Sequence, residues 1–512
     1  MARVTLEAKQ ERIVRTLEGP LFVSAGAGSG KTFTLTQRIA WALMPGSGAD
    51  GAPFLSSIDE ALVITFTNKA AGEIKDRIRQ TLRAEGMQAE ALKVDSAWVS
   101  TIHGMCNRIL HEHALEFGLD PAFELASDND AADARLEALN RVVARAKEAP
   151  ERPYGDLFSQ LDANKIDAQV SHVLDMVSHE PKGFDAISFG PAPAAAGEIA
   201  RELLPLAEAA LDNDPEKHEV QYAAAERAVE TFNAVLAAPT EEDQERILQE
   251  FIDGKNYKQY NTKPSRPLWK ALGHAATELE LAGTTRRLHE IVRLAHDVES
   301  AYRDLLAARG LIDMASLVPL TLAALRSHPA IAAAYTDRFK LIMVDEFQDT
   351  SQLQIDMIEC IAGTDKRHLC TVGDSQQSIY RFQGADVGVY LQHKRDMLSD
   401  GVGAHIEHLV DNFRSHGDIL AFVRRVCGQP GYFIEDFLDL QAATEGRTYH
   451  GSAPRIELAL TTYTDRATSV DAARATEAAH IADRFAALRD AGHKANDMVI
   501  LMGTTTGSDI YA

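Results

Sequence analysis

Long apolar runs are absent from this sequence, and so is any segment that resembles a leader. No run of roughly eighteen apolar residues occurs, so we expect no membrane span. The first residues, MARVTLEAKQERIV, lack the apolar centre of a signal peptide. We therefore expect a protein without a membrane partner that works in the cytoplasm.

Cysteine is scarce as well. The four cysteines show no CxxC spacing, so neither a zinc site nor a disulfide framework is indicated; they are Cys106, Cys360, Cys370 and Cys427. Reduced thiols of this kind are typical of a cytosolic protein. No fixed-period repeat and no low-complexity tail stand out, and 512 residues exceed one compact core, so we expect two to four domains.

Positive charge is in deficit, with a net charge of −23. Since phosphate binding requires Lys and Arg, this value alone argues against a nucleic-acid partner. The distribution weakens that argument. Residues 116–315 hold 37 acidic and 21 basic residues, a net of −16, whereas the remainder holds 38 and 31, a net of −7. Most of the excess lies in one block, so a basic groove elsewhere is compatible with the composition.

Helix and strand signals alternate over residues 1 to about 110, which predicts a parallel sheet with helices on its faces. From about 116 to 335 apolar residues recur at helical spacing, which predicts a helical insertion. Strand signals return with FKLIMVD, HLCTVG and HIEHLV. A third region begins near Asn412 and contains a predicted helix at 473–492 and a predicted strand at 497–503.

The strongest motif is SAGAGSGKT, residues 24–32, which follows an apolar strand and opens a helix. This is the context of a P-loop, in which backbone N–H groups cradle phosphates, Lys31 reaches the β- and γ-phosphates and Thr32 ligates Mg²⁺. Ala25 departs from the usual first glycine. The simpler interpretation is an ordinary glycine-rich turn at a helix start. The predicted nucleotide-binding residues of the loop are Ser24, Ala25, Gly26, Ala27, Gly28, Ser29, Gly30, Lys31 and Thr32.

A P-loop requires an acidic partner at the end of a neighbouring strand, and LIMVDE, residues 341–346, supplies one. We expect Asp345 to hold Mg²⁺ and Glu346 to accept a proton from the attacking water. Alone, an apolar strand that ends in acids is explained by a strand end and a turn. Beside a P-loop, the same acids indicate nucleotide hydrolysis.

Six motifs now stand in one order: VSAGAGSGKT, VITFTNKAAGEIKDRI, STIHGMCNRIL, IMVDEFQDTSQLQ, TVGDSQQSIYRFQGAD and LVDNFRS. In sequence and order they resemble motifs I, Ia, Ib, II, III and IV of superfamily 1 DNA helicases of the UvrD type. The resemblance covers residues 1 to about 110 and 311 to about 420. It implies an ATP- and Mg²⁺-dependent motor that moves 3′ to 5′ on single-stranded DNA and opens duplex at single-strand/duplex junctions.

The resemblance also assigns roles to single residues. Gln10 would read the adenine edge, Arg38 would lie near the base, and Phe413 would stack on adenine. Arg414 would contact the γ-phosphate, and Gln377 would sense it, although Gln376 leaves the register of that assignment open. The predicted catalytic set is Lys31, Asp345, Glu346, Gln377 and Arg414.

Single-stranded DNA binding requires polar groups that face phosphates and aromatic faces for stacking. Such side chains lie at the end of the predicted strand ALVITFT and in STIHG and SIYRFQGAD. The predicted DNA-binding residues are Thr65, Phe66, Asn68, Lys69, His103, Tyr380 and Phe382. Core packing is the competing explanation for each aromatic residue. Gln383 departs from the arginine that many relatives carry at this position.

Motifs V and VI of the family are not found after NFRS, and we expect an N-terminal fragment that binds nucleotide but hydrolyses it poorly. The predicted fold class is α/β: a RecA-like P-loop sheet with a large helical insertion and the start of a second RecA-like domain. The predicted domains are 1–115 and 311–405 for the two parts of the first RecA-like domain, 116–310 for the insertion, and 406–512 for the second.

The long spacing between P-loop and DEFQDT favours the RecB- and AddA-like branch over the UvrD and PcrA branch. This branch implies DNA repair or recombination and a possible nuclease or recombination partner subunit. The alternatives are an ATP-driven translocase subunit that does not unwind on its own, a subunit with a decayed motor, and an unrelated P-loop kinase or transporter ATPase. Intact Lys31, Asp345 and Glu346 argue against the second, and TFTNKAA and NFRS argue against the third.

Overall fold

The computed structural model describes residues 6–149, 154–178, 180, 182–380, 386–399, 403–433, 437–443, 456–460, 470–504 and 506–511. Two compact units divide the chain. The first comprises Met1–Met105 and Leu325–Ala512, and the second comprises Cys106–Ala324. The boundaries between the units fall within helices α5 (Ile102–Glu112) and α13 (Leu317–Ser327).

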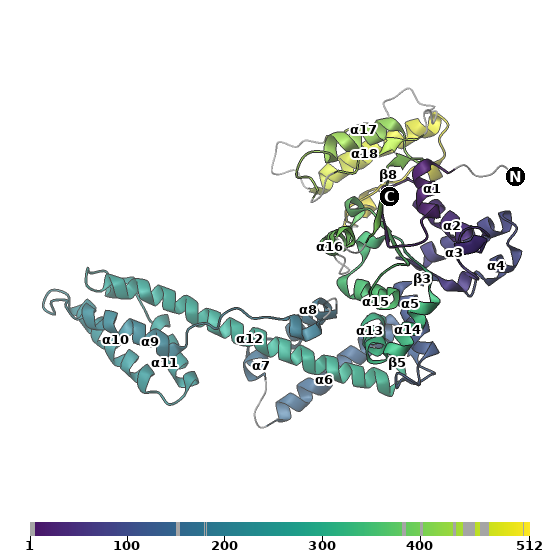
Figure 1. The fold of residues 1–512 in the computed structure, drawn as a ribbon. Helices are drawn as coiled ribbons and strands as arrows, with labels where there is room; N and C mark the ends of the chain where they lie inside the picture. The colour runs from purple at the N-terminus through teal and green to yellow at the C-terminus, as the bar shows by residue number, and fades with distance from the viewer. Residues whose placement is uncertain are drawn as a thin grey trace. The chain divides into compact units, whose positions relative to one another are not determined.

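A six-stranded sheet in the order β3-β2-β6-β7-β1-β8 forms the centre of the first unit (Figure 1). All its neighbouring strands run parallel. The predicted α/β class with a parallel sheet is therefore confirmed. The strands are β1 (Leu21–Ala25), β2 (Ala61–Thr65), β3 (Trp98–Thr101), β6 (Leu341–Val344), β7 (Leu369–Gly373) and β8 (His405–Leu409).

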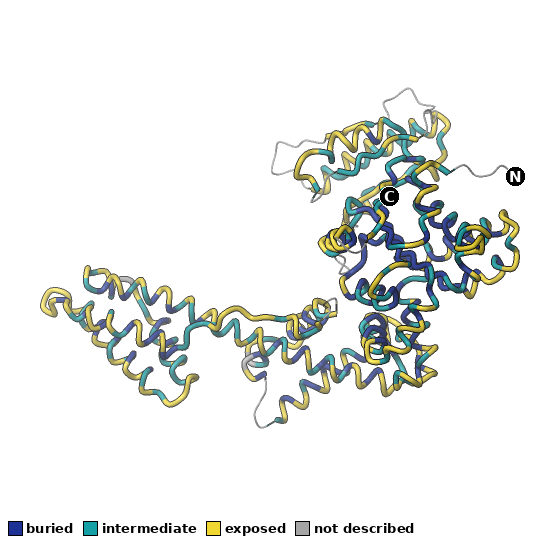
Figure 2. Tube along the Cα trace, viewed as in Figure 1, coloured by how far each residue is buried: buried dark blue, intermediate teal, exposed yellow. Residues whose placement is uncertain are grey.

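Both faces of this sheet are buried along its inner strands β1, β2, β6 and β7, as is usual for a parallel sheet, whereas the edge strand β8 is partly exposed (Figure 2). Alternate residues such as Val23, Val63 and Met343 face one core, which helices α1, α2 and α3 complete. On other strand positions, Trp98 packs its ring edge-on against Phe339. The helices of the unit outside α5 and α13 are α1 (Ala8–Arg15), α2 (Lys31–Ala42), α3 (Asn68–Ala84), α4 (Gln88–Lys93), α14 (Pro329–Arg338), α15 (Gln352–Ala362), α16 (Val387–Leu398), α17 (Gly417–Cys427) and α18 (Val470–Asp490).

β8 pairs with β1 over its full length, from Leu21↔His405 to Ala25↔Leu409. The sequence assigned 406–409 to the start of a second domain, but these residues complete the edge of the first sheet. After β8, the short strands β9 (Asp411–Asn412) and β10 (Gln441–Ala442) pair in parallel. The second RecA-like domain stays a prediction.

Two secondary-structure predictions in the last hundred residues had different outcomes. The predicted helix at 473–492 is confirmed as α18. The predicted strand at 497–503 is wrong, because residues 498–502 form no strand and Val499 and Leu501 are exposed. Alternating apolar residues form a strand only when a neighbouring strand shares their hydrogen bonds, and no described segment pairs with this one.

The second unit consists of helices around two separate cores. One core is formed by α6, α7, α8 and the second half of α12, and the other by α9, α10, α11 and the first half of α12. The 43-residue helix α12 thus belongs to both (Figure 1). The elements of the second unit outside α5 and α13 are α6 (Asp128–Glu148), α7 (Gly155–Gln160), α8 (Ala163–Ser178), α9 (Ala196–Ala210), α10 (Glu219–Ala237), α11 (Glu241–Asp253), α12 (Arg266–Ala308) and the paired strands β4 (Glu124–Leu125) and β5 (Leu311–Ile312).

Among the described residues, no single helix is long and apolar enough to cross a membrane, and only the bent pair α13 and α14 meets that test jointly.

Candidate functional site

The glycine-rich turn joins the carboxyl end of β1 to the amino end of α2. Ser24 and Ala25 end the strand, and Lys31 and Thr32 begin the helix. Gly28 and Gly30 have φ values of 71° and 81°, a left-handed conformation that glycine adopts without a Cβ penalty. The turn therefore has the conformation of an anion-binding nest at a helix N-terminus.

Asp345 and Glu346 directly follow β6. In the sheet, β6 is separated from β1 by the single strand β7. Lys31 Nζ donates to Glu346 Oε2 at 2.9 Å, and the two side chains are 11% and 35% exposed. Glu346 has φ 53° and ψ 40°, an uncommon conformation for a residue with a side chain. The Asp345 backbone N–H donates to Ile64 O at 2.9 Å, so β2 fixes the start of this turn. The predicted P-loop lysine and strand-end acids are thus brought together.

The pKa values of the two acids shift in opposite directions. Burial, together with the neighbouring Glu346 charge, raises the pKa of Asp345 to about 6 against the opposing effect of Lys31. Burial also acts to raise the pKa of Glu346, but the charge of Lys31 and hydrogen bonds from Gln348 and Lys31 outweigh it and leave that pKa lowered. Glu346 is consequently the ionised partner of Lys31.

Gln348, Asp349 and Asp374 belong to the same cluster but received no role from the sequence. Gln348 is 1% exposed, and its Nε2 donates to Glu346 Oε2 at 2.8 Å and to Asp349 Oδ2 at 3.1 Å. Its Oε1 accepts the backbone N–H of Asp374 at 3.0 Å. Gln348 therefore links the ends of β6 and β7. The sequence signal that could have indicated this role is a glutamine among the acids of DEFQD, residues 345–349.

Gln377, the predicted γ-phosphate sensor, lies directly after β7. Its side-chain Nε2 donates to Asp374 Oδ2, and its backbone N–H donates to Asp374 O at 2.9 Å. The backbone N–H of Gln376 donates to the same carboxylate at 3.1 Å. Asp374 thus holds both glutamines in one short turn, so the choice between them stays a prediction.

Gln10 belongs to α1, and Arg38 belongs to α2 and contacts α1. Gln10 Nε2 is 3.5 Å from Ser29 O in the P-loop, so its amide reaches the turn. Arg38 is 1% exposed and donates from Nη1 to Ile13 O, and burial lowers its pKa. Arg38 therefore fixes α1 from within the core and leaves almost no surface for a base. Its predicted place near the base stays a prediction.

Phe413 and Arg414 follow β9 and lie against the P-loop. The Phe413 backbone N–H donates to Gly28 O at 2.8 Å. A Cβ placed on Gly28 would lie 2.7 Å from the Arg414 Cβ, so the close approach requires glycine. The side chain of Arg414 is exposed and that of Phe413 is half-buried. Both predicted residues are thus adjacent to the phosphate-binding turn.

The predicted DNA-binding residues lie at or beyond the ends of β2, β3 and β7. Phe66 and Tyr380 are brought together, with ring centroids 4.5 Å apart. Asn68 and Lys69 are exposed in the first turn of α3, whereas Thr65 is buried and offers little surface. Burial lowers the pKa of His103. Phe382, together with Gln383, lies outside the described residues.

Asp345 and Thr32 offer oxygen ligands of the type that Mg²⁺ takes. No group of three or more His, Cys, Asp or Glu side chains that could hold a metal occurs in the described ranges. A single carboxylate and a hydroxyl fit Mg²⁺, which usually keeps several waters and binds through one or two carboxylates and substrate phosphates. The buried Ser29 Oγ, which has no hydrogen-bond partner among described residues, is a further polar atom within the turn.

Asp349 provides a test of the buried acid cluster. Burial and the nearby Glu346 raise its pKa to about 6 from an ordinary value of 3.8. Between pH 4 and 6 the folded state therefore binds more protons than the unfolded state, and this acid contributes less stability as pH rises. Asp349→Asn removes this carboxyl group. We therefore expect the substitution to change the free energy of unfolding more favourably at pH 8 than at pH 4.5, by on the order of 2 kcal/mol.

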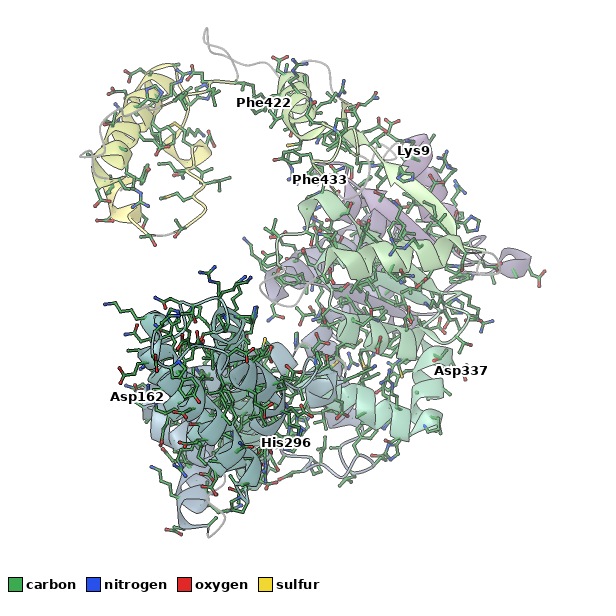
Figure 3. The ribbon with its side chains drawn as sticks, turned by 90° about the vertical axis from the view of Figure 1, so that its left-hand side faces the viewer. Lys9, Asp162, His296, Asp337, Phe422 and Phe433 are labelled. Carbon is green, nitrogen blue, oxygen red and sulfur yellow. The ribbon has the colours of Figure 1, made fainter. Side chains whose placement is uncertain are left out.

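Urea unfolding of the unsubstituted chain and of Asp349→Asn, each at pH 4.5 and pH 8, measures this difference. The matched control is Asp337→Asn, an exposed residue of α14 (Figure 3). The same pH-dependent difference in both variants would contradict a specific effect of burial at Asp349.

Comparison with known proteins adds independent evidence. Three curated relatives are each named as a subunit of an ATP-dependent helicase/nuclease. The protein from Syntrophomonas wolfei is 24% identical over 90% of this chain, that from Staphylococcus aureus strain USA300/TCH1516 is 24% identical over 78%, and that from Limosilactobacillus fermentum is 26% identical over 83%. The matches cover 42%, 37% and 37% of the relatives, so the chain spans about two fifths of their length.

These relatives are of the AddA type and confirm the predicted RecB- and AddA-like branch. The sequence profile of the UvrD/REP helicase N-terminal domain matches residues 6–398, which include the P-loop, the acids after β6 and the turn after β7. Sheet order, ion pair and profile agree, and the chain belongs to the UvrD/REP helicase N-terminal domain family.

Proposed function

We propose that this chain is the nucleotide- and DNA-binding part of an ATP-dependent DNA helicase that moves 3′ to 5′ on single-stranded DNA and acts in repair or recombination. The contact between Lys31 and Glu346 carries the proposal, because it places the P-loop cation against the acid that would activate water. Its substrates would be single-stranded DNA and single-strand/duplex junctions, and its place of work the cytoplasm.

Lys31 would exchange partners when ATP binds. In the observed arrangement its ammonium group neutralises Glu346. The β- and γ-phosphates of a bound nucleotide carry more negative charge and would draw the ammonium away. Glu346 would then lose the interactions with Lys31 that lower its pKa. The carboxylate would become a stronger base when a water molecule is placed to attack the γ-phosphate.

Mg²⁺ would be held by Thr32 and Asp345, and when bound it would neutralise charge on the phosphates. Gln348 would keep Glu346 oriented through its 2.8 Å hydrogen bond. Arg414, exposed beside Gly28, would contact the γ-phosphate and stabilise charge that develops during cleavage. Because hydrolysis removes that contact, it can bias a conformational cycle that moves DNA.

A second candidate is an ATPase or translocase subunit of a helicase–nuclease complex that does not unwind DNA on its own. The relatives' names, which describe a subunit of a helicase/nuclease, favour this possibility. A nuclease or recombination protein would then be the partner.

Strand displacement distinguishes the two candidates. The protein at its natural length is mixed with partial duplexes that carry a 3′ or a 5′ single-stranded tail, and release of the labelled strand is followed with ATP and Mg²⁺. Unwinding of the 3′-tailed duplex alone supports the 3′-to-5′ helicase. ATP hydrolysis stimulated by single-stranded DNA without strand release supports the second candidate, and no stimulation would contradict both.

Lys31→Ala tests nucleotide binding by the chain itself. The substitution removes the only cation that the described residues place on Glu346 and that the P-loop directs at phosphates. We expect the affinity for fluorescent N-methylanthraniloyl-ADP with Mg²⁺ to fall at least about 30-fold, roughly 2 kcal/mol. Lys93→Ala, which removes a lysine paired with Glu90 on α4, is the control and should bind normally. Unchanged binding by Lys31→Ala would contradict the assignment.

Phe66→Ala tests the aromatic pair beyond β2. Base stacking on an aromatic ring contributes about 1–3 kcal/mol, so we expect roughly tenfold weaker binding of a fluorescent oligo(dT), measured by anisotropy at fixed salt. Phe422→Ala, which truncates an exposed phenylalanine of α17 (Figure 3), is the control. Equal affinities of the Phe66 variant and the original protein would show that the pair only packs against itself.

A further inference from the structure

Three successive carbonyl groups of the P-loop accept hydrogen bonds on their outer side. Ala27 O accepts Asn412 Nδ2 at 2.6 Å, and Gly28 O accepts the backbone N–H of Phe413 at 2.8 Å. Ser29 O accepts Gln10 Nε2 at 3.5 Å, a long contact. Donors from α1 and from the segment after β8 thus line the outside of one short turn.

Peptide geometry gives these outer contacts a consequence inside the turn. In a planar trans peptide the carbonyl of one residue and the N–H of the next point in opposite directions. Donors on the carbonyls of residues 27, 28 and 29 therefore turn the N–H groups of Gly28, Ser29 and Gly30 to the other side. The Ser29 N–H is already engaged, because it donates to Gly26 O at 3.2 Å and closes the turn, so the N–H groups of Gly28 and Gly30 are the ones directed at a ligand. Inward N–H groups of this kind form a nest for a phosphate oxygen.

Asn412 is the side chain at the centre of this arrangement. It is 1% exposed, and its Oδ1 accepts the backbone N–H groups of Arg414 at 2.9 Å and Ser415 at 2.7 Å. One amide therefore holds a P-loop carbonyl with its nitrogen and the backbone that presents Arg414 with its oxygen. A Cβ on Gly28 would come within 3.0 Å of this amide, so only glycine leaves room for it.

Leu440 packs against the first part of the turn. A Cβ added to Gly26 would lie 2.3 Å from its Cδ2, so the leucine packs directly on the first glycine of the turn. The flanking backbone is fixed by hydrogen bonds from Gln441 N to Val410 O and from Ala443 N to Asn412 O, both 2.9 Å. An apolar side chain therefore covers part of the turn, and an unsatisfied carbonyl is costly where water is excluded.

We propose that Asn412 is a positioning residue for phosphate binding: by holding Ala27 O outward it keeps the P-loop N–H groups directed at the nucleotide, and it couples that state to Arg414. The inference rests on the proposed function of the P-loop. A role limited to local folding would predict a loss of stability without any dependence on the number of phosphates.

The test compares ADP with AMP, which lacks the β-phosphate that the nest would hold. Binding of N-methylanthraniloyl-ADP and its displacement by unlabelled ADP or AMP are measured with Mg²⁺ for the unsubstituted chain and for Asn412→Leu, a neutral substitution of similar size. We expect the dissociation constant of ADP to rise about tenfold, equivalent to about 1.4 kcal/mol, and that of AMP to change less than about twofold.

The matched control is Asn213→Leu in the second unit. Asn213 is also buried, and its Nδ2 donates to the backbone carbonyl of Ala210 and to Ser265 Oγ, so it tests the general cost of losing a buried amide. Its ratio of ADP to AMP affinity should equal that of the unsubstituted chain. If thermal melting shows that Asn412→Leu does not fold, Asn412→Ser, whose hydroxyl is too short to reach Ala27 O, replaces it.

An unchanged ratio in a folded Asn412 variant would overturn the inference and leave the proposed function standing. Equal weakening of ADP and AMP would also overturn it, because it indicates general damage. Failure of the unsubstituted chain to bind ADP would overturn the proposed function and, with it, this inference.

Discussion

The ion pair between Lys31 and Glu346 joins residues 315 positions apart in the chain, and the rest of the site is arranged around it. In such a partly buried pair the cost of removing charges from water offsets much of the Coulombic attraction, so the pair contributes little net stability. Its importance under the proposed function is that it holds both side chains in place before nucleotide binds. Lys31 Nζ lies beside Glu346, whose pKa is lowered, and under the proposed function a phosphate of the nucleotide would replace the glutamate as the partner of the lysine.

The parallel sheet makes this contact possible, because the carboxyl ends of all its strands meet at one edge. The P-loop follows β1, the two acids follow β6, and the turn that contains Gln377 follows β7. The helical insertion interrupts the chain between β3 and β6 without disturbing this edge, since it folds around two cores of its own.

The sequence predicted the parts of the site that lie within one continuous motif. SAGAGSGKT and LIMVDE each carry a local signal, a glycine turn before a helix and acids after an apolar strand. It could not predict Gln348 as the bridge between β6 and β7, or Asn412 as the donor to Ala27, because these roles are defined by contacts between distant segments. Arg38, which the family resemblance places near the base, is 1% exposed and donates to Ile13 O of α1, a contact that no local pattern reveals.

The fold shows the same division. Strands with continuous apolar runs were recognised because both faces of a parallel sheet are buried. The assignment of β8 to the first sheet depended on its pairing with β1, which no local pattern reveals. Conversely, the apolar alternation at 497–503 satisfied the strand pattern but finds no neighbour among the described strands. Propensity favours an element, and a hydrogen-bonding partner decides whether it forms.

A crystal structure of this chain with ADP and Mg²⁺ tests the central claim most directly. The account predicts the β-phosphate within the turn from Gly26 to Thr32, with Lys31 Nζ moved from Glu346 Oε2 onto a phosphate oxygen and Asp345 facing the metal. A nucleotide bound elsewhere, or a Lys31 ammonium that still lies on Glu346 with phosphate in the turn, would contradict it.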